Sequence, residues 1–124
     1  MPGIIIFRPI EAEFDQKEPN VVYPYCKFKV GHHSARSVKA KSQDCHAEWK
    51  DVVTLERNKF EDSAKIKVKS TDQRGFPYLI GSARIDIKPI LCHNKISQWI
   101  PLINDHQITG RILLEIDYVP IPTK

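Results

Sequence analysis

The sequence has little of what would assign it to a membrane, secreted or disulfide-rich class. Its longest apolar run is far shorter than the roughly 20 residues that a membrane-spanning helix requires. Its three cysteines are an odd number at wide spacing, which argues against a disulfide framework and favours a reducing compartment. The first residues, MPGIIIF, lack the basic region and long apolar core of a secretory signal. We therefore expect a cytoplasmic protein.

Catalytic signatures are also missing. The sequence contains no G-x-S-x-G, no G-x-x-x-x-G-K-[ST] phosphate loop and no H-E-x-x-H. Its basic residues are not interleaved with aromatic ones as in an RNA-binding RRM. These absences predict a protein that is not an enzyme, uses no cofactor and does not bind nucleic acid.

Two Cys–His pairs raise the hypothesis of a zinc site, because thiolates and imidazoles are zinc ligands. The pairs are Cys45–His46 and Cys92–His93. Neither has the C-x₂₋₄-C or H-x₃₋₅-H spacing typical of such sites, and adjacent residues of a strand point to opposite faces. We therefore predict no metal site.

What the sequence does contain is the ordinary composition of one globular domain. It has 124 residues, 41% apolar and 27% charged. A chain of this length buries roughly two thirds of its unfolded surface, so its folding requires neither a disulfide nor a metal. We predict a single domain over residues 1–120. A short tail follows at 121–124, where prolines remove backbone donors that a strand needs.

Apolar and polar residues alternate with a period of two in several segments. Ala64, Ile66 and Val68 share one face of a predicted strand, with lysines on the other face. We predict eight strands, near residues 3–14, 24–31, 35–41, 49–55, 64–69, 79–88, 97–102 and 109–119. Short strands with one dry and one wet face, without long helices between them, predict an all-β, antiparallel β-sandwich.

Five segments resemble, in the same order, motifs of the calcium/lipid-binding C2 domain family. They are Tyr23–Gly31 (Ser-Asp-Pro-Tyr…Gly in the family), His46–Asp51 (Asn-Pro-x-Trp-Asn-Glu), Tyr78–Gly81 (Phe-Ile-Gly), Trp99–Leu102 (Trp-x-x-Leu) and Gly110–Leu114 (Gly-x-Ile/Leu-x-Leu). The resemblance covers residues 3–119. It implies a Greek-key β-sandwich that acts at membranes or docks other proteins.

The resemblance also implies a calcium site of about five aspartates on three loops, and few of these acids are present. Asp15 and Asp72 fall on acidic positions, and Arg74 adds a positive charge beside the second. Other acidic positions are occupied by Tyr23, Ser70, Pro77 and Tyr78. Because Ca²⁺ takes six to eight oxygen ligands, two carboxylates do not suffice. We therefore predict a member that does not depend on calcium.

Basic residues offer the second route to membranes that the resemblance implies. The net charge is +4, and residues 24–50 alone sum to +4. The lysines that we predict to bind anionic phospholipid, either phosphatidylserine or a phosphoinositide, are Lys27, Lys29, Lys39, Lys41 and Lys50. Lys39 and Lys41 alternate onto one face of a predicted strand, as do Lys27 and Lys29. Phe76 and Tyr78, at a loop tip, would add apolar contact.

Two functions remain open from the sequence. The first is a monomeric, peripheral membrane-targeting module that binds anionic lipid without calcium. The second is a protein-interaction module that binds neither lipid nor calcium, which the replacement of so many acids favours. For the lysines, the simplest alternative is a solvated strand face that contributes to solubility. We favour membrane targeting because the basic segment is retained.

Overall fold

The computed structural model describes residues 3–15, 23–40, 45–58, 60–71, 74–93 and 95–121. Within these ranges it contains nine strands and one short helix. The elements are β1 (Gly3–Phe14), β2 (Tyr25–Val30), β3 (His33–Arg36), β4 (His46–Glu48), β5 (Val53–Arg57), β6 (Ser63–Thr71), β7 (Pro77–Asp86), α1 (Lys88–His93), β8 (Lys95–Asn104) and β9 (Gln107–Pro120).

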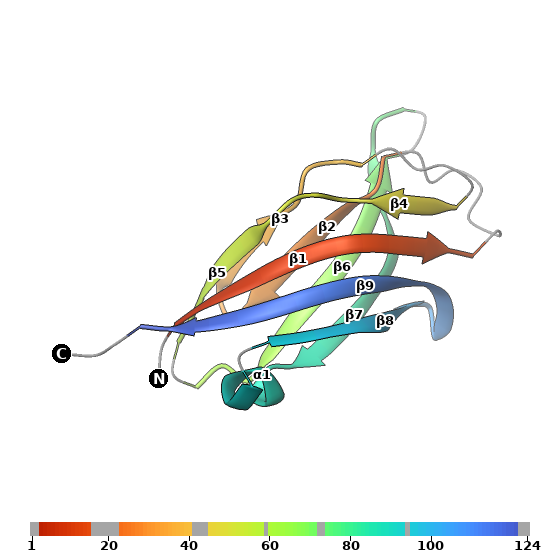
Figure 1. Cartoon of the computed structure of the whole chain (residues 1–124). Coiled ribbons are helices and arrows are strands. Elements are labelled where there is room, and N and C mark those ends of the chain that lie inside the picture. Colours follow the sequence, from red (N-terminus) through yellow and green to blue (C-terminus); the bar gives the residue numbers. More distant parts are fainter. Residues whose placement is uncertain are drawn as a thin grey trace.

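The strands form one antiparallel sheet that curls into two layers. One layer has the order β3-β2-β6-β7; the other has the order β8-β9-β1-β4, with β5 also paired to β1. The layers join where β7 and β8 share a single register pair, Ser82↔Ile103. Figure 1 shows β1 and β9 crossing in front of β2 and β6. This arrangement confirms the prediction of an all-β, antiparallel sandwich.

The hydrophobic core lies between the two layers and is filled by alternate residues of the strands. Phe7 of β1 stacks on Phe28 of β2, with ring centroids 4.5 Å apart and ring planes inclined by 15°. Both side chains are fully buried. Stacked aromatic pairs contribute roughly 0.5–1.5 kcal/mol beyond their area burial. The stack therefore fixes one layer against the other at a defined residue on each strand.

The strand predicted at 49–55 is present only in its last part, as β5, because residues 49–52 are not in a strand. The structure adds β4 just before it, which was not predicted, so the sheet has nine strands instead of eight. Both β4 and β5 pair with β1. Between β4 and β5, the chain leaves the ladder opposite Pro9, which has no backbone N–H to donate. The pairing of β1 with β9 also shifts register between Pro9 and Glu11. The Trp49 backbone N–H bonds to the Ile10 carbonyl as the chain departs.

The strand predicted at 35–41 ends at Arg36. Beyond it, Ser37 Oγ accepts a hydrogen bond from the Cys26 backbone N–H at 2.9 Å. A side chain thus takes the place of a backbone carbonyl in the ladder, a competition typical of serine. Ser37 and Ala40 are both buried, which breaks the period of two that the prediction assumed.

The helix α1 was not among the predicted elements, because six residues are too few for a helical period to be visible. Asp86 Oδ1 accepts a hydrogen bond from the Lys88 backbone N–H at 3.0 Å where the helix begins. Ile87 and Ile90 are fully buried, so this turn closes one end of the sandwich (Figure 1). None of the helices that the structure describes is both long and apolar enough to cross a membrane.

Cys26 gives the core a measurable dependence on pH. Burial in the core raises the pKa of its thiol far above the ordinary value of 9.0, because the thiolate would be desolvated. The unfolded chain therefore loses this proton above pH 9 while the folded chain keeps it. The stabilisation is complete below that pH and is lost as the pH rises.

We expect the free energy of unfolding of the wild type, minus that of Cys26→Ala, to fall by about 1 kcal/mol between pH 9 and pH 10, with a slope that approaches about 1.4 kcal/mol per pH unit at higher pH. Urea denaturation of both proteins at pH 8, 9 and 10 would measure this difference in free energy of unfolding. Because the two proteins share all other titrating groups, the effects of those groups cancel in the difference. A difference that stays constant over this range would contradict the assignment of Cys26 to the sealed core.

Candidate anion-binding face

The outer side of the β3-β2-β6-β7 layer carries a dense set of cations. The register of β2 with β6 places Lys27 directly opposite Lys67, and Lys29 directly opposite Lys65. Because alternate residues of a strand share one side, all four point away from the core. The basic face is defined by the outward residues Lys27, Lys29, Arg36, Lys39, Lys65, Lys67, Lys69 and Arg84.

The cations of the basic face have no carboxylate partner among the ion pairs of the described residues. Those ion pairs lie elsewhere: Arg8 with Glu115 and Asp117, Lys95 with Glu115, Arg57 with Asp62, Arg111 with Glu13, and His46 with Glu11. Like charges directly opposite each other destabilise an antiparallel pair. An anion bound on this face would relieve a repulsion that the described part of the chain does not neutralise.

Three hollows follow β2 along the basic face. The first, of about 430 Å³, is lined by Tyr25, Arg36, Ser37, Val38 and Lys39. The second, of about 140 Å³, is lined by Lys27, Lys29, Lys65 and Lys67. The third, of about 260 Å³, is lined by Lys29, Gly31, Ser63, Lys65 and Arg84. Each hollow therefore has at least two cationic side chains around it.

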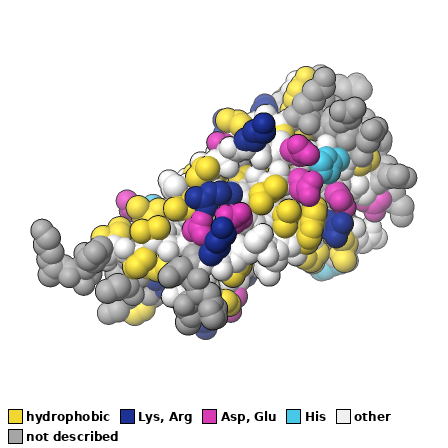
Figure 2. Space-filling view, viewed as in Figure 1, with side chains coloured by type: hydrophobic (Ala, Val, Ile, Leu, Met, Phe, Trp, Pro, Cys, Tyr) yellow, Lys and Arg dark blue, Asp and Glu magenta, His cyan; other side chains and the backbone are white. Residues whose placement is uncertain are grey.

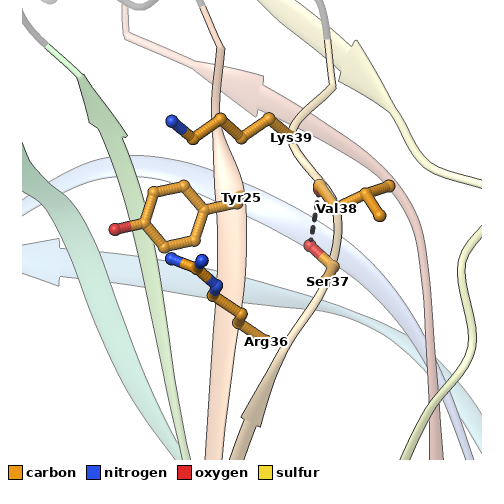
Figure 3. A pocket seen from close by; sticks show the side chains of 5 residues that line it. All are labelled: Tyr25, Arg36, Ser37, Val38 and Lys39. Carbon is orange, nitrogen blue, oxygen red and sulfur yellow. Dashed lines mark hydrogen bonds between the residues drawn. The ribbon is translucent and has the colours of Figure 1, made fainter. Parts of the chain in front are cut away.

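Tyr25 organises the first hollow. The Arg36 guanidinium carbon lies 5.6 Å from the centroid of its ring, and Lys39 Nζ lies 6.0 Å from it. Figure 3 shows both side chains pointing toward the ring from either side, with Val38 pointing away. The negative face of an aromatic ring attracts cations at such distances. Tyr25 thus holds two positive charges at one place on the surface.

The structure brings three of the five predicted lysines to this face. Lys27 and Lys29 are exposed on β2, and Lys39 is exposed beside Tyr25. Lys39 does not belong to a strand, so the predicted alternation does not place it; its position depends on the irregular segment that follows β3. Lys50 is exposed between β4 and β5, in the other layer, and lines none of the three hollows. Lys41 lies outside the described residues.

The sequence prediction did not include the cations that β6 and β7 contribute. The alternation of residues 64–69 already showed that Lys65 and Lys67 face outward. Which strand lies beside β6 was not visible, because non-local pairing leaves no periodic signal in the sequence. Arg36 and Arg84 complete the face from β3 and β7, each directly opposite a lysine.

Of the two aromatic residues predicted to contact a membrane from the loop tip, one is exposed to solvent. Phe76 is 62% exposed and lies 5.7 Å from the Arg74 guanidinium carbon. Tyr78 is partly buried and packs against the core. Phe76 is therefore the residue of this pair that offers a large apolar surface to solvent.

The structure shows where four of the positions lie at which the resemblance implies calcium-binding acids. Asp15 is exposed, and its backbone N–H bonds to the Thr109 carbonyl. Ser70 is fully buried. Pro77 begins β7 and Tyr78 packs inward. Asp72 lies outside the described residues. Asp15 belongs to no convergent group of three metal ligands within the described ranges.

Comparisons with known proteins agree on one family. The family model for the C2 domain matches residues 9–102. A C2 domain-containing protein superposes with a TM-score of 0.83 at 16% identity, covering 99% of this chain and 93% of that one. A C2 domain of plant Extended Synaptotagmin 1 gives 0.75 at 16% identity, covering 98% and 97%. A pair of C2 domains from Extended-Synaptotagmin 2 gives 0.76 at 19% identity, covering 94% and 40%. No curated protein sequence matches.

The paired lysines predict a gain of stability on charge reversal. We expect Lys67→Glu to raise the free energy of unfolding by about 0.5 kcal/mol, because it replaces a like-charge pair with Lys27 by an opposite-charge pair. Urea denaturation at low salt would measure this gain, which 1 M NaCl should largely remove. Lys50→Glu makes the same charge change away from the face and serves as the control. An equal gain in both variants would show that net charge, and not the register, is responsible.

Proposed function

Since this chain belongs to the C2 domain family, we propose that it is a non-catalytic module that attaches its protein to anionic phospholipid membranes without calcium. The observation that carries the proposal is the four-lysine hollow between β2 and β6. There two like-charge pairs face each other, and none of the four enters an ion pair of the described residues. A phosphate group placed between these pairs would neutralise charge from both strands.

The energy available suits reversible attachment. Each basic residue near an anionic leaflet contributes on the order of 1 kcal/mol, and this contribution is screened by salt. Eight cations on one face, not all engaged at once, would therefore give weak and salt-sensitive binding. The exposed Phe76 could add an apolar contact at the end of the sandwich. Such a surface concentrates its protein at a membrane without committing it there permanently.

The arrangement of the hollows favours one type of lipid headgroup over another. The hollows lie next to one another along β2, since Lys29 lines both the second and the third. A headgroup with several phosphates would reach more of these cations than phosphatidylserine, whose single phosphate would occupy one hollow. We therefore expect a phosphoinositide to bind more tightly than phosphatidylserine at equal surface charge.

Liposome sedimentation tests the proposal. Vesicles of phosphatidylcholine alone are compared with vesicles that contain phosphatidylserine or a phosphoinositide, matched in total charge. We expect binding to the anionic vesicles only, weaker with added salt and unchanged by either EDTA or Ca²⁺. The double variant Lys27→Glu/Lys65→Glu should bind roughly tenfold or more weakly, given the contribution of each lysine.

Lys50→Glu provides the matched control, because it reverses an exposed lysine outside the three hollows and should bind nearly as well as the wild type. If Lys50→Glu weakened vesicle binding as much as Lys27→Glu or Lys65→Glu does alone, the assignment of binding to the basic face would be wrong. Binding that requires Ca²⁺ would contradict calcium independence. If no vesicle bound while a stoichiometric protein were recovered from cells, the chain would be an interaction module instead.

A further inference from the structure

A cluster of glutamate and histidine side chains lies on the opposite layer, where β1 pairs with β4. The register places Glu11 directly opposite Glu48 and Glu13 directly opposite His46. Ala12 and Ala47 lie between these pairs and are buried. The glutamates and the histidine therefore all project from the outer side of the sheet. Figure 2 shows acidic and histidine side chains gathered over this part of the molecule.

Three of these side chains converge on one point. His46 Nε2 lies 2.7 Å from Glu11 Oε2. With Glu48, they each offer one ligand atom, and the three atoms lie within 4.8 Å of one another. Glu11 and His46 are half-buried, with 30% and 36% of their side-chain surface exposed, and Glu48 is exposed. Two ligands come from one strand in an H-x-E pattern, and the third comes from its neighbour.

Among the ion pairs of the described residues, the two opposed glutamates have one partner between them, His46, which contacts Glu11. Glu13, the other acid on this side, is already neutralised by Arg111, whose Nη2 lies 2.9 Å from Glu13 Oε2. Arg111 is held in turn over the Trp99 ring, 4.2 Å from its centroid. Glu48 is in none of the ion pairs of the described residues. Glu11 and Glu48 oppose each other directly, an arrangement that costs stability unless a cation lies between them.

We propose that Glu11, His46 and Glu48 bind a divalent first-row transition metal, for which Zn²⁺ is the reference ion. One imidazole nitrogen with two carboxylate oxygens matches the ligands of three-residue zinc sites, whereas Ca²⁺ and Mg²⁺ take oxygen ligands. With a neutral imidazole, the two carboxylates balance the charge of a divalent ion. The fourth position stays open for water or for a group from a partner.

The geometry requires only small side-chain movements. Tetrahedral coordination with bonds near 2.0–2.2 Å separates ligand atoms by about 3.3 Å. The distance between Glu11 Oε2 and His46 Nε2 must grow from 2.7 Å by about 0.6 Å, and Glu48 must swing inward. Both movements are side-chain rotations near the surface, so the strands need not move. The site is independent of the basic face, which lies on the other layer.

The bound ion would also change the sheet itself. β4 has three residues, and the described chain leaves its outer edge without a further strand. Short edge strands are held weakly and expose backbone groups that can pair with other chains. A metal shared between β1 and β4 would link this edge strand to a twelve-residue strand in the sheet. Metal binding should therefore appear as greater resistance to unfolding.

Isothermal titration calorimetry of the whole chain with ZnCl₂ tests the proposal, with thermal unfolding followed by circular dichroism as a second readout. We expect one equivalent of Zn²⁺ to bind and to raise the melting temperature, with no saturable binding of Mg²⁺ at the site. Glu48→Gln and His46→Ala should each weaken Zn²⁺ binding roughly tenfold or more. Because Glu48 is exposed, Glu48→Gln should fold as the wild type does without metal.

Three control variants keep the test specific. Glu13→Gln removes a neighbouring acid that is already paired, and His33→Ala removes a histidine elsewhere; both should retain wild-type affinity. Cys45→Ser removes the thiol next to His46 and should also retain it. If Cys45→Ser abolished binding while Glu48→Gln did not, the ion would be bound by the thiol and the proposed ligand set would be wrong. Absence of saturable Zn²⁺ binding would leave a histidine–glutamate ion pair and overturn the proposal.

Discussion

The register of the antiparallel strand pairs is the constraint on which both the core and the candidate sites depend. In a strand, neighbouring residues face opposite sides, so a shift by one position would exchange every inward side chain with an outward one. The Phe7–Phe28 stack between the layers opposes any such shift of β2, because it would leave a buried ring exposed. The same register sets Lys27 against Lys67 on the outside. Core packing thus determines the arrangement of charge on the surface.

The two layers present different chemistry to solvent. The β3-β2-β6-β7 layer carries the basic face, while the β1–β4 pair on the other layer carries the Glu11–His46–Glu48 cluster. If the domain attaches to an anionic surface as proposed, the concentration of cations on one layer would turn the basic face toward that surface. The cluster would then face away from the membrane. The two proposed sites therefore do not compete for the same surface.

Local patterns predicted most of the fold but only part of the candidate face. Alternation located β1 with the bounds that the structure shows and β6 within two residues at either end. It missed α1, which is too short to show a period, and the irregular segment at Ser37, where a hydroxyl enters the ladder. The charge excess of residues 24–50 placed Lys50 beside the lysines of β2 in the prediction, because nearness in sequence was the available guide; in the structure Lys50 lies between β4 and β5. The lysines of the strand that contains Lys65 were left out of the predicted lipid-binding set for the same reason.

The sequence by itself determined the fold class, the family and the outward direction of the lysines on β2 and β6, because alternation and ordered motifs are local properties of the chain. Which outward side chains meet was decided by the tertiary structure alone. Lys27 and Lys67 are 40 positions apart, and Glu11 and His46 are 35 positions apart, yet each pair lies on adjacent strands. Pairing at such separations depends on how the two layers bury the whole core together. No short segment carries that information.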